Sequence, residues 1–400
     1  MSGVVIVGAG QAGLEAAAAL RAQGYQESVT LIGDEPHPPY QRPPLSKEYL
    51  LGKQGADNLP LRGRVFYEKH GITLRMGETV ASIDRAAHRI QTGKGEIPYG
   101  KLILATGARN RVLPVPGAER ALYLRTWDEA DTIRRRIEGS VRVAVIGGGF
   151  IGLEIAAAAR TLGKAVTIIE ALPRLMARAV SPPLSDFFRD VHRGEGAEVL
   201  LDSTVREIAE DAVVLTDQRR CAADLVLAGI GVVPNMELAR GAGLATGNGI
   251  TVDEFLKTSD PDIYAIGDCA DHPNLFAGGR ARLESVQNAA DQAKCAARGI
   301  VGNPTPYRDV PWFWTDQFGV RFQMAGLSAG HDRTALRGSV ENRKFSMFYF
   351  KQARLLAVDS VNRFGDHIAA RKMLAAGTPL TPEQAADETV DFKKLGVTAP

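Results

Sequence analysis

Runs of apolar, mostly β-branched residues alternate with alanine-rich segments in the first half of the chain. Val4–Val7 precede a helical pattern over residues 14–21, and Val141–Ile146 precede a second helical pattern over residues 153–162. Short, uninterrupted apolar runs of this kind are typical of parallel strands that are buried on both faces. The pattern therefore predicts two strand–turn–helix units and an α/β fold.

The turn in each unit carries glycines at the spacing Gly-x-Gly-x-x-Gly, at residues 8–13 and 147–152. The first glycine permits a tight turn, the second lets the backbone approach a pyrophosphate, and the third permits close packing of helix on strand. The helix start then presents unpaired N–H groups to the phosphates. Glycine turns without a ligand fit the same spacing, but the flanking strands and helices favour two dinucleotide sites. The candidate residues are Gly8, Gly10 and Gly13 in the first turn and Gly147, Gly149, Phe150, Ile151 and Gly152 in the second.

An acidic residue after the second strand of each unit supports this interpretation. Residues 166–169 lead directly into Glu170, and a carboxylate there accepts a hydrogen bond from an adenosine 2′-hydroxyl and repels a 2′-phosphate. We expect a preference for NADH over NADPH, softened by Arg174 and Arg178 nearby. In the first unit the expected ribose ligand is Asp34, one residue later than usual. An ordinary solvated loop charge is the alternative for either acid.

The later chain suggests that the first domain is discontinuous. A strand over residues 102–107 ends the first unit, Pro114 and Pro116 mark a linker, and a further strand ends in Gly267-Asp268. Asp268 can accept hydrogen bonds from the ribityl hydroxyls of a flavin, or cap the helix predicted over residues 285–300. We expect dinucleotide-binding domains at residues 1–108 with 243–317 and at 109–242. A smaller α+β domain is expected at 318–400, with a loosely ordered end.

The composition narrows the class of protein. The 400 residues are 45% hydrophobic and carry a net charge of +2, which predicts globular domains without a general attraction to nucleic acid or membrane. No apolar run is long enough for a membrane span, and the first strand begins at Val4, which leaves no room for a signal peptide. We expect a cytoplasmic protein without a metal site.

The three cysteines, Cys221, Cys269 and Cys295, are widely separated and form no Cys-x-x-Cys pair. This usage fits a reducing compartment without a disulfide framework. Flavoproteins that reduce disulfides carry a redox-active cysteine early in the chain, and this chain has none there. Each cysteine is therefore expected to be a small buried residue.

Four further motifs stand in a recognisable order: Tyr40-Gln41-Arg42-Pro43-Pro44-Leu45-Ser46-Lys47, Tyr123-Leu124-Arg125-Thr126, Gly267-Asp268-Cys269-Ala270 and Pro311-Trp312-Phe313-Trp314-Thr315-Asp316-Gln317. With the glycine turns, they make nearly the whole chain resemble the bacterial NADH-dependent ferredoxin reductases of the putidaredoxin reductase type. The resemblance implies FAD in the first site, NADH in the second, and a 2Fe-2S ferredoxin as electron acceptor. Such a ferredoxin serves a monooxygenase of the cytochrome P450 type or a ring-hydroxylating dioxygenase.

The resemblance also implies roles for individual residues. Lys47 lies where a cation stands beside the flavin ring and stabilises its reduced, anionic form, and Glu154 lies where an acid stands near the nicotinamide and pairs with that lysine. From the sequence alone, Ser46 is expected to cap a following helix. The FAD contacts implied are Ala12, Asp34, Arg42, Lys47, Val80, Ala105, Thr106, Gly107, Arg125, Asp268, Val286 and Trp314. The NAD contacts implied, beyond the second turn, are Glu154, Glu170, Arg178 and Gly231.

The surface that meets the ferredoxin is expected to include Trp312, Arg62 and Lys294, with Arg64 and Arg298 as further basic candidates. A cationic rim would steer an acidic partner, although a few basic residues are usually only solvated surface.

Two other functions remain open from the sequence. The same fold with another acceptor would make the protein a rubredoxin reductase or an NADH oxidase. Alternatively, the protein is not an electron supplier but a signalling flavoprotein, related to apoptosis-inducing factor, that turns over slowly.

Overall fold

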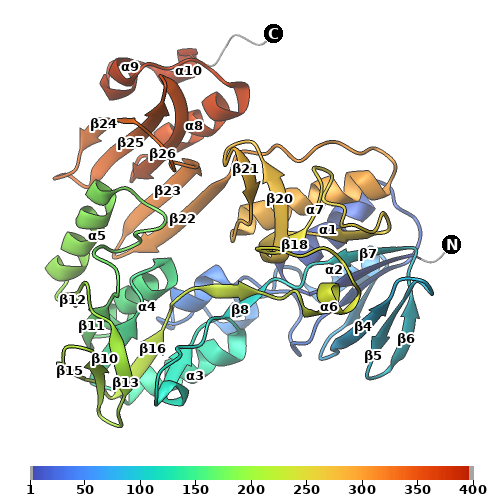
Figure 1. Ribbon diagram of the computed structural model, residues 1–400, viewed down its shortest axis with the longest axis horizontal. Helices are drawn as coiled ribbons and strands as arrows, with labels where there is room; N and C mark the ends of the chain where they lie inside the picture. The colour runs from blue at the N-terminus through green and yellow to red at the C-terminus, as the bar shows by residue number, and fades with distance from the viewer. Residues whose placement is uncertain (1–2, 396–400) are drawn as a thin grey trace.

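The computed structural model describes residues 3–395, which form three parts (Figure 1). The first part, at the right of the figure, combines the blue N-terminal segment with the gold segment around α7 (Val286–Ile300). The second part is green and lies at the lower left, and the third is orange to red and lies at the upper left. The mixed α/β architecture with two parallel sheets confirms the predicted fold class.

The first part is built on a five-stranded parallel sheet in the order β19-β7-β1-β2-β3. Its strands are β1 (Val4–Val7), β2 (Val29–Ile32), β3 (Ile72–Arg75), β7 (Lys101–Leu104) and β19 (Ile263–Ala265). Because β19 pairs with β7, the chain returns to this sheet after leaving it for more than 150 residues, as the sequence predicts. Helix α1 (Gln11–Ala22) follows β1 and packs against α7.

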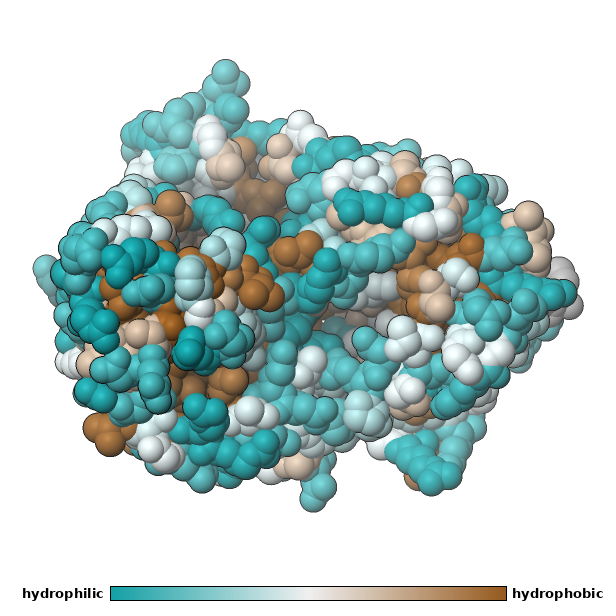
Figure 2. Space-filling model, turned by 60° about the horizontal axis from the view of Figure 1, so that its bottom comes forward, coloured by the Kyte–Doolittle hydropathy of each residue, from teal (hydrophilic) through white to brown (hydrophobic). Residues whose placement is uncertain are grey.

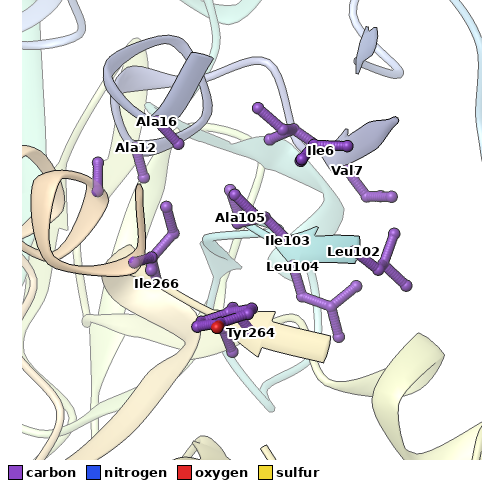
Figure 3. Packing of buried hydrophobic residues seen from close by; sticks show 14 of the residues in the cluster. Ile6, Val7, Ala12, Ala16, Leu102, Ile103, Leu104, Ala105, Tyr264 and Ile266 are labelled. Carbon is purple, nitrogen blue, oxygen red and sulfur yellow. The ribbon is translucent and has the colours of Figure 1, made fainter. Parts of the chain in front are cut away.

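Small side chains let α1 approach the strands closely. Figure 3 shows Ala12 and Ala16 of α1 facing Ala105 and Ile266, all of them buried. At Gly13 a Cβ would lie 2.0 Å from the carbonyl oxygen of Gly8, so only glycine permits this contact. The sequence pattern therefore fixes the position of the helix start relative to the sheet.

The second part repeats this plan with a parallel sheet in the order β12-β11-β10-β16-β9. Helix α4 (Phe150–Thr161) follows the central strand β10 and is buried along most of its length. Helices α3 (Trp127–Glu138) and α5 (Pro182–Gly194) complete this part. The strands are β9 (Ala121–Tyr123), β10 (Arg142–Ile146), β11 (Ala165–Ile169), β12 (Glu198–Leu200) and β16 (Leu225–Ala228).

Short strands connect and extend these sheets. The chain crosses between the first two parts through β8 (Ala108–Asn110) and returns through β17 (Val232–Pro234), which pair antiparallel. Helix α2 (Arg64–Lys69) precedes β3, and helix α6 (Glu237–Gly241) follows β17. Three small sheets contain β4 (Val80–Asp84), β5 (Arg89–Thr92) and β6 (Gly95–Pro98); β13 (Val205–Ile208), β14 (Ala212–Leu215) and β15 (Arg220–Ala222); and β18 (Ile250–Thr251), β20 (Ala270–Asn274) and β21 (Gly279–Ala281).

The third part is a five-stranded antiparallel sheet, β22-β23-β26-β25-β24, with α8 (Phe364–Ala376) packed on it. Its strands are β22 (Trp312–Gln317), β23 (Val320–Gly326), β24 (Arg333–Ser339), β25 (Lys344–Lys351) and β26 (Arg354–Val361). A boundary after residue 317 would cut this sheet, because β22 pairs with β23 along its whole length. We therefore propose that the C-terminal domain begins at Trp312, and otherwise keep the division expected from the sequence.

The last residues that the structure describes, up to residue 395, form regular structure where a loosely ordered end was expected. Two short helices, α9 (Pro382–Ala386) and α10 (Phe392–Leu395), follow α8. The buried guanidinium of Arg337 donates to the carbonyl oxygens of residues 387, 388 and 390 and lies 4.2 Å from the ring centre of Phe392. This side chain helps to hold the segment to the sheet, together with the ion pairs Arg333–Glu383 and Arg363–Glu388, and its position on a central part of β24 was not evident from sequence spacing.

The surface agrees with the balanced composition. Figure 2 shows a mainly hydrophilic face, with hydrophobic residues in separate patches and a hollow near the centre of the view. Among residues 3–395, no helix is both long and apolar enough to cross a membrane.

Candidate functional site

The first glycine turn forms an open cradle at the carboxyl end of β1. Gly8 has a φ of +113°, and a Cβ there would lie 2.1 Å from the carbonyl oxygen of Ala105, so this glycine is required by the fold. Gly10, at the N-cap of α1, is different: its backbone is extended (φ −89°, ψ −160°) and nothing lies within 4 Å of the position of a Cβ. The fold does not need glycine there, whereas close approach of a phosphate to the backbone does.

Three charged side chains lie beside this cradle. Arg125 donates from Nη2 to Asp268 Oδ2 at 2.8 Å, and Arg42 donates from Nη1 to the carbonyl oxygen of Arg125 at 2.5 Å. A Cβ on Gly107 would lie 3.7 Å from Arg125 Nη2, and a Cβ on Gly267 would lie 3.0 Å from that of Ala12. The structure thus brings together predicted residues of five separate segments, which are Ala12, Arg42, Gly107, Arg125 and Asp268.

Arg125 supplies a second sign that this region suits a ligand. Its Nε is buried and has no hydrogen-bond partner among the described residues. A buried guanidinium N–H without an acceptor is costly, and an anionic or carbonyl group of a bound cofactor would satisfy it. The residues present therefore fit FAD.

Asp34 and its neighbour Glu35 differ in whether their carboxylates are free to bind a ligand. The Glu35 carboxylate accepts hydrogen bonds from Tyr40 Oη at 2.5 Å and Arg42 Nη2 at 2.6 Å. Asp34 is exposed and has no such partner in the described part of the chain. This difference favours Asp34 as the residue left to bind a ribose, as predicted.

The second glycine turn has the same geometry. Gly147 has a φ of +105° and approaches the carbonyl oxygen of Gly229, and a Cβ on Gly152 would lie 2.1 Å from the carbonyl oxygen of Gly147. Gly149 at the N-cap of α4 has an extended backbone (φ −82°, ψ 179°), and the nearest atom to a Cβ there would be 4.0 Å away. The second cradle is therefore also open where a pyrophosphate would approach.

Glu170 lies directly beside this second cradle. Its carboxylate accepts the backbone N–H of Gly148 at 2.7 Å and of Leu172 at 2.8 Å. Arg178 is nearby, because its Nη2 would lie 3.7 Å from a Cβ on Gly231. Arg174, by contrast, is committed to the fold: it donates to two carbonyl oxygens and to Ser185. The expectation that Arg174 softens nucleotide preference is therefore not supported by its contacts.

The expected pair of Lys47 and Glu154 is present. Lys47 Nζ lies 2.6 Å from Glu154 Oε2, and the two side chains are 12% and 2% exposed. The prediction that Ser46 caps a following helix is wrong. Ser46 ends the short 3₁₀ helix Pro43–Ser46, and its Oγ donates to Glu154 Oε2 at 2.5 Å. Two consecutive residues of the first part thus contact one buried carboxylate of the second.

The sequence left open whether Asp268 caps α7, and the structure shows that it does not. Ser285 accepts the N–H of Asn288 at 3.0 Å and is the N-cap, so Asp268 does not cap this helix. Val286 is the first residue of α7, whose start lies near the short helix that contains Asp268.

Strand β22 carries aromatic residues between α4 and α7. The rings of Trp312 and Trp314 are 5.5 Å apart, and the Arg371 guanidinium lies 4.5 Å from the Trp312 ring centre. Phe313 points to the other side, where its ring lies 4.7 Å from that of Phe150 at the start of α4. The alternation of the strand thus directs two tryptophans to one side and a phenylalanine to the second glycine turn.

The basic residues expected to meet a partner form two separate groups. Arg62 and Arg64 are exposed around the start of α2, and Arg64 pairs with Glu68 at 2.8 Å. Lys294 and Arg298 lie one turn apart on α7, where Lys294 pairs with Asp291 at 3.2 Å. No interaction joins the two groups within residues 3–395, so the expected rim stays a prediction.

The cysteines are poorly suited to redox chemistry. Cys269 and Cys295 are buried, and burial raises the pKa of the Cys295 thiol to about 11. Burial also raises the pKa of Cys221 and Cys269. Because the thiolate is the reactive form, burial disfavours redox chemistry at these cysteines.

The remaining predicted residues lie at the edges of the two cradles. Thr106 is fixed by Asn235, since its Oγ1 donates to the Asn235 carbonyl at 2.7 Å and its own carbonyl accepts from Asn235 Nδ2 at 2.9 Å. Val80 begins β4 just after Glu78, whose N–H donates to the Gly33 carbonyl at 2.9 Å. Ile151 is 44% exposed on the first turn of α4.

Sequence reasoning missed one residue of the site. Thr315 is completely buried and donates from Oγ1 to Glu154 Oε1 at 2.6 Å. The signal was a polar residue that directly follows the aromatic residues 312–314 of the motif at 311–317. Burial of such a hydroxyl requires a partner, but the sequence does not name it.

Replacement of Glu170 by alanine is expected to raise the KM for NADH about tenfold, the effect of losing one hydrogen bond to a charged group, and to narrow the difference between NADH and NADPH. The carboxylate that repels a 2′-phosphate would be gone, and the Gly148 N–H would lose its acceptor. Steady-state kinetics with both nucleotides measure this. Asp217→Ala, which removes an exposed carboxylate of the same domain, is the control. Unchanged kinetics for Glu170→Ala would refute the assignment.

The comparisons with known proteins agree with this geometry. The family model described as pyridine nucleotide-disulphide oxidoreductase matches residues 2–293, and the one described as reductase C-terminal matches residues 312–396. Rhodocoxin reductase of Rhodococcus erythropolis is 51% identical over 98% of this chain and 93% of its own length.

Two solved structures are similar over almost the whole chain. The ferredoxin reductase for the CYP199A2 system from Rhodopseudomonas palustris is 46% identical, with a TM-score of 0.97 over 99% of this chain and 100% of its own. The reductase in the covalent putidaredoxin reductase–putidaredoxin complex is 40% identical, with a TM-score of 0.95 over 98% of each chain. The chain therefore belongs to the pyridine nucleotide-disulphide oxidoreductase family, and it is an FAD- and NAD(P)H-dependent oxidoreductase of the ferredoxin reductase type.

Proposed function

We propose that this protein transfers electrons from NADH through FAD to a 2Fe-2S ferredoxin, which supplies a P450-type monooxygenase or a ring-hydroxylating dioxygenase, in the cytoplasm. The observation that carries the proposal is the pair of open glycine cradles on two sheets, with Lys47 and Glu154 joined across the junction between them. FAD supplies the chemistry, since it takes a hydride from NADH and returns electrons singly. The residues of this chain bind the two dinucleotides, orient them and tune the reactivity of the flavin.

The first cradle would hold FAD. Gly10 and the start of α1 receive the pyrophosphate, Asp34 a ribose, and Asp268 the ribityl hydroxyls, while Arg125 offers its unpartnered N–H. In the second cradle Gly149 receives the pyrophosphate of NADH. Glu170 receives the adenosine ribose of NADH, and Arg178, near Gly231, offers a guanidinium to the phosphates.

Lys47 is the residue best placed to tune reactivity. Its ammonium is held by Glu154 on one side and donates to the carbonyl oxygen of Pro43 at 3.2 Å. A fixed cation favours the negative charge that the flavin gains on reduction. The absence of a reactive thiol among the described cysteines agrees with a reaction that needs no protein nucleophile.

The test is reduction of an added 2Fe-2S ferredoxin. The purified yellow protein is mixed with NADH under anaerobic conditions, and the visible absorption of the ferredoxin is followed. Reduction within the turnover time of NADH oxidation supports the proposal. Electron delivery to rubredoxin or oxygen, with none to any 2Fe-2S ferredoxin, would contradict it. The control is Gly149→Ala reduced chemically, which should still pass electrons to the ferredoxin although it accepts few from NADH.

A further inference from the structure

The Glu154 carboxylate is held by all three parts of the molecule. Oε2 accepts from Ser46 and Lys47 of the first part, and Oε1 accepts from Thr315 of the third at 2.6 Å. The side chain is almost completely buried. A buried carboxylate depends strongly on its donors, so each of these contacts affects how its charge acts on Lys47.

The contact with Thr315 continues into a longer chain of hydrogen bonds. Gln317 Nε2 donates to Thr315 Oγ1 at 3.2 Å, and Gln317 Oε1 lies 2.9 Å from His192 Nε2. Thr315, Gln317 and His192 are each at most 1% exposed. Residues of β22 and α5 are thereby connected to a carboxylate on α4.

The direction of every hydrogen bond in this chain is determined by its chemistry. Gln317 Oε1 can only accept, so His192 Nε2 must carry the proton. Thr315 has one hydroxyl hydrogen, and because the Glu154 carboxylate can only accept, that hydrogen goes to Glu154 while the Thr315 oxygen accepts from Gln317. The other ring nitrogen, His192 Nδ1, is buried without a partner among the described residues, and burial lowers the pKa of His192, so the ring stays neutral with a single N–H.

We propose that Thr315, Gln317 and His192 act as positioning residues, a directed hydrogen-bond chain by which the C-terminal domain sets the charge environment of the Lys47–Glu154 pair and so the rate of flavin reduction by NADH. The inference rests on the proposed function. In each of these hydrogen bonds the hydrogen points toward Glu154, and these aligned dipoles offset part of the negative charge of Glu154 beside the flavin. Without the hydrogen-bond chain more of that negative charge would act on the flavin, so the oxidised flavin should be harder to reduce.

Thr315→Val tests the first link, since it keeps the shape and removes the hydroxyl. We expect reduction of FAD by NADH to slow about tenfold, the size of effect that follows loss of one hydrogen bond to a charged group. The two-electron midpoint potential should fall by about 30 mV, the equivalent of a tenfold change in equilibrium constant. Thr315→Ser, which keeps the hydroxyl, should restore the rate to within about twofold of the wild type.

A matched control removes the same kind of contact elsewhere. Ser346 Oγ donates to the buried Asp366 carboxylate at 2.9 Å within the same domain. Ser346→Ala should lower the stability of the holoprotein and leave the rate of flavin reduction and the potential unchanged. If Thr315→Val behaves like Ser346→Ala, the contact is merely structural and the inference is overturned.

Gln317→Leu provides a second variant that does not touch Glu154. The rate of flavin reduction should fall about threefold, because Thr315 loses the hydrogen bond that it accepts from Gln317. In a Thr315→Val background, Gln317→Leu should have no further effect. Equal effects of Gln317→Leu in both backgrounds would refute the proposed hydrogen-bond chain. Stopped-flow flavin reduction and redox titration of the holoprotein measure each variant. A wild type that NADH does not reduce would instead contradict the proposed function.

Discussion

Alanine at position 10 is expected to leave the fold intact and to deprive the protein of FAD. The backbone at Gly10 is in an extended conformation that any residue adopts, and the space beside it is open. A methyl group would therefore meet no protein atom, but it would occupy the surface on which a pyrophosphate must lie. We expect FAD affinity to fall at least 100-fold, roughly 2.7 kcal/mol.

Flavin content after purification and FAD titration of the apoprotein measure this effect. Gly63→Ala is a matched control, because Gly63 is also an N-cap, has an extended backbone (φ −71°, ψ 160°) and has nothing within 4 Å of a Cβ, but belongs to α2. Both apoproteins should unfold within about 0.5 kcal/mol of the wild type. Retention of FAD by the Gly10→Ala protein would show that the first cradle does not bind a pyrophosphate.

The architecture of the first two domains was predictable because it depends on local patterns. Apolar runs such as Val4–Val7 specify buried parallel strands, and the glycines at 8 and 13 are needed where α1 crosses the end of β1. The return of the chain to the first sheet also followed from a short strand ending in Gly267-Asp268. These signals lie within a few residues of the structure that they specify.

The contacts around Glu154 were predictable only in part. The resemblance suggested Lys47 as its partner, but Ser46 was expected to cap a helix and Thr315 had no assigned role. Ser46 and Lys47 are consecutive, but both they and Thr315 lie more than 100 residues from Glu154 along the chain and meet it across domain boundaries. Spacing along the chain carries no information on such a meeting. Equally, the expected boundary at residue 317 assigns β22 to the first domain, whereas the hydrogen bonds of β22 join it to β23 of the C-terminal sheet.

Lys47→Met is expected to lower both the stability of the protein and the rate of flavin reduction. It leaves the Glu154 charge buried without its cation, which typically costs about 3–5 kcal/mol, with the lower end expected here because Ser46 and Thr315 still donate to the carboxylate. Flavin reduction by NADH should slow about 100-fold, since the cation proposed to stand beside the flavin is lost. Urea unfolding of the holoprotein and stopped-flow absorbance measure the two effects.

Two further variants separate the fold from the electrostatics. Lys101 pairs with Asp262 on the surface, where the side chains are 35% and 31% exposed, so Lys101→Met should cost no more than about 1 kcal/mol and leave the rate unchanged. The double variant Lys47→Met/Glu154→Gln removes both buried charges and should regain most of the lost stability, because the amide oxygen can still accept from Thr315 while the amide NH2 donates to Ser46 Oγ, whose hydrogen turns to the Pro43 carbonyl oxygen. The rate should stay low, since the cation is still missing. Recovery of the rate together with the stability would mean that Lys47 serves only to neutralise Glu154, and the tuning role proposed for it would be wrong.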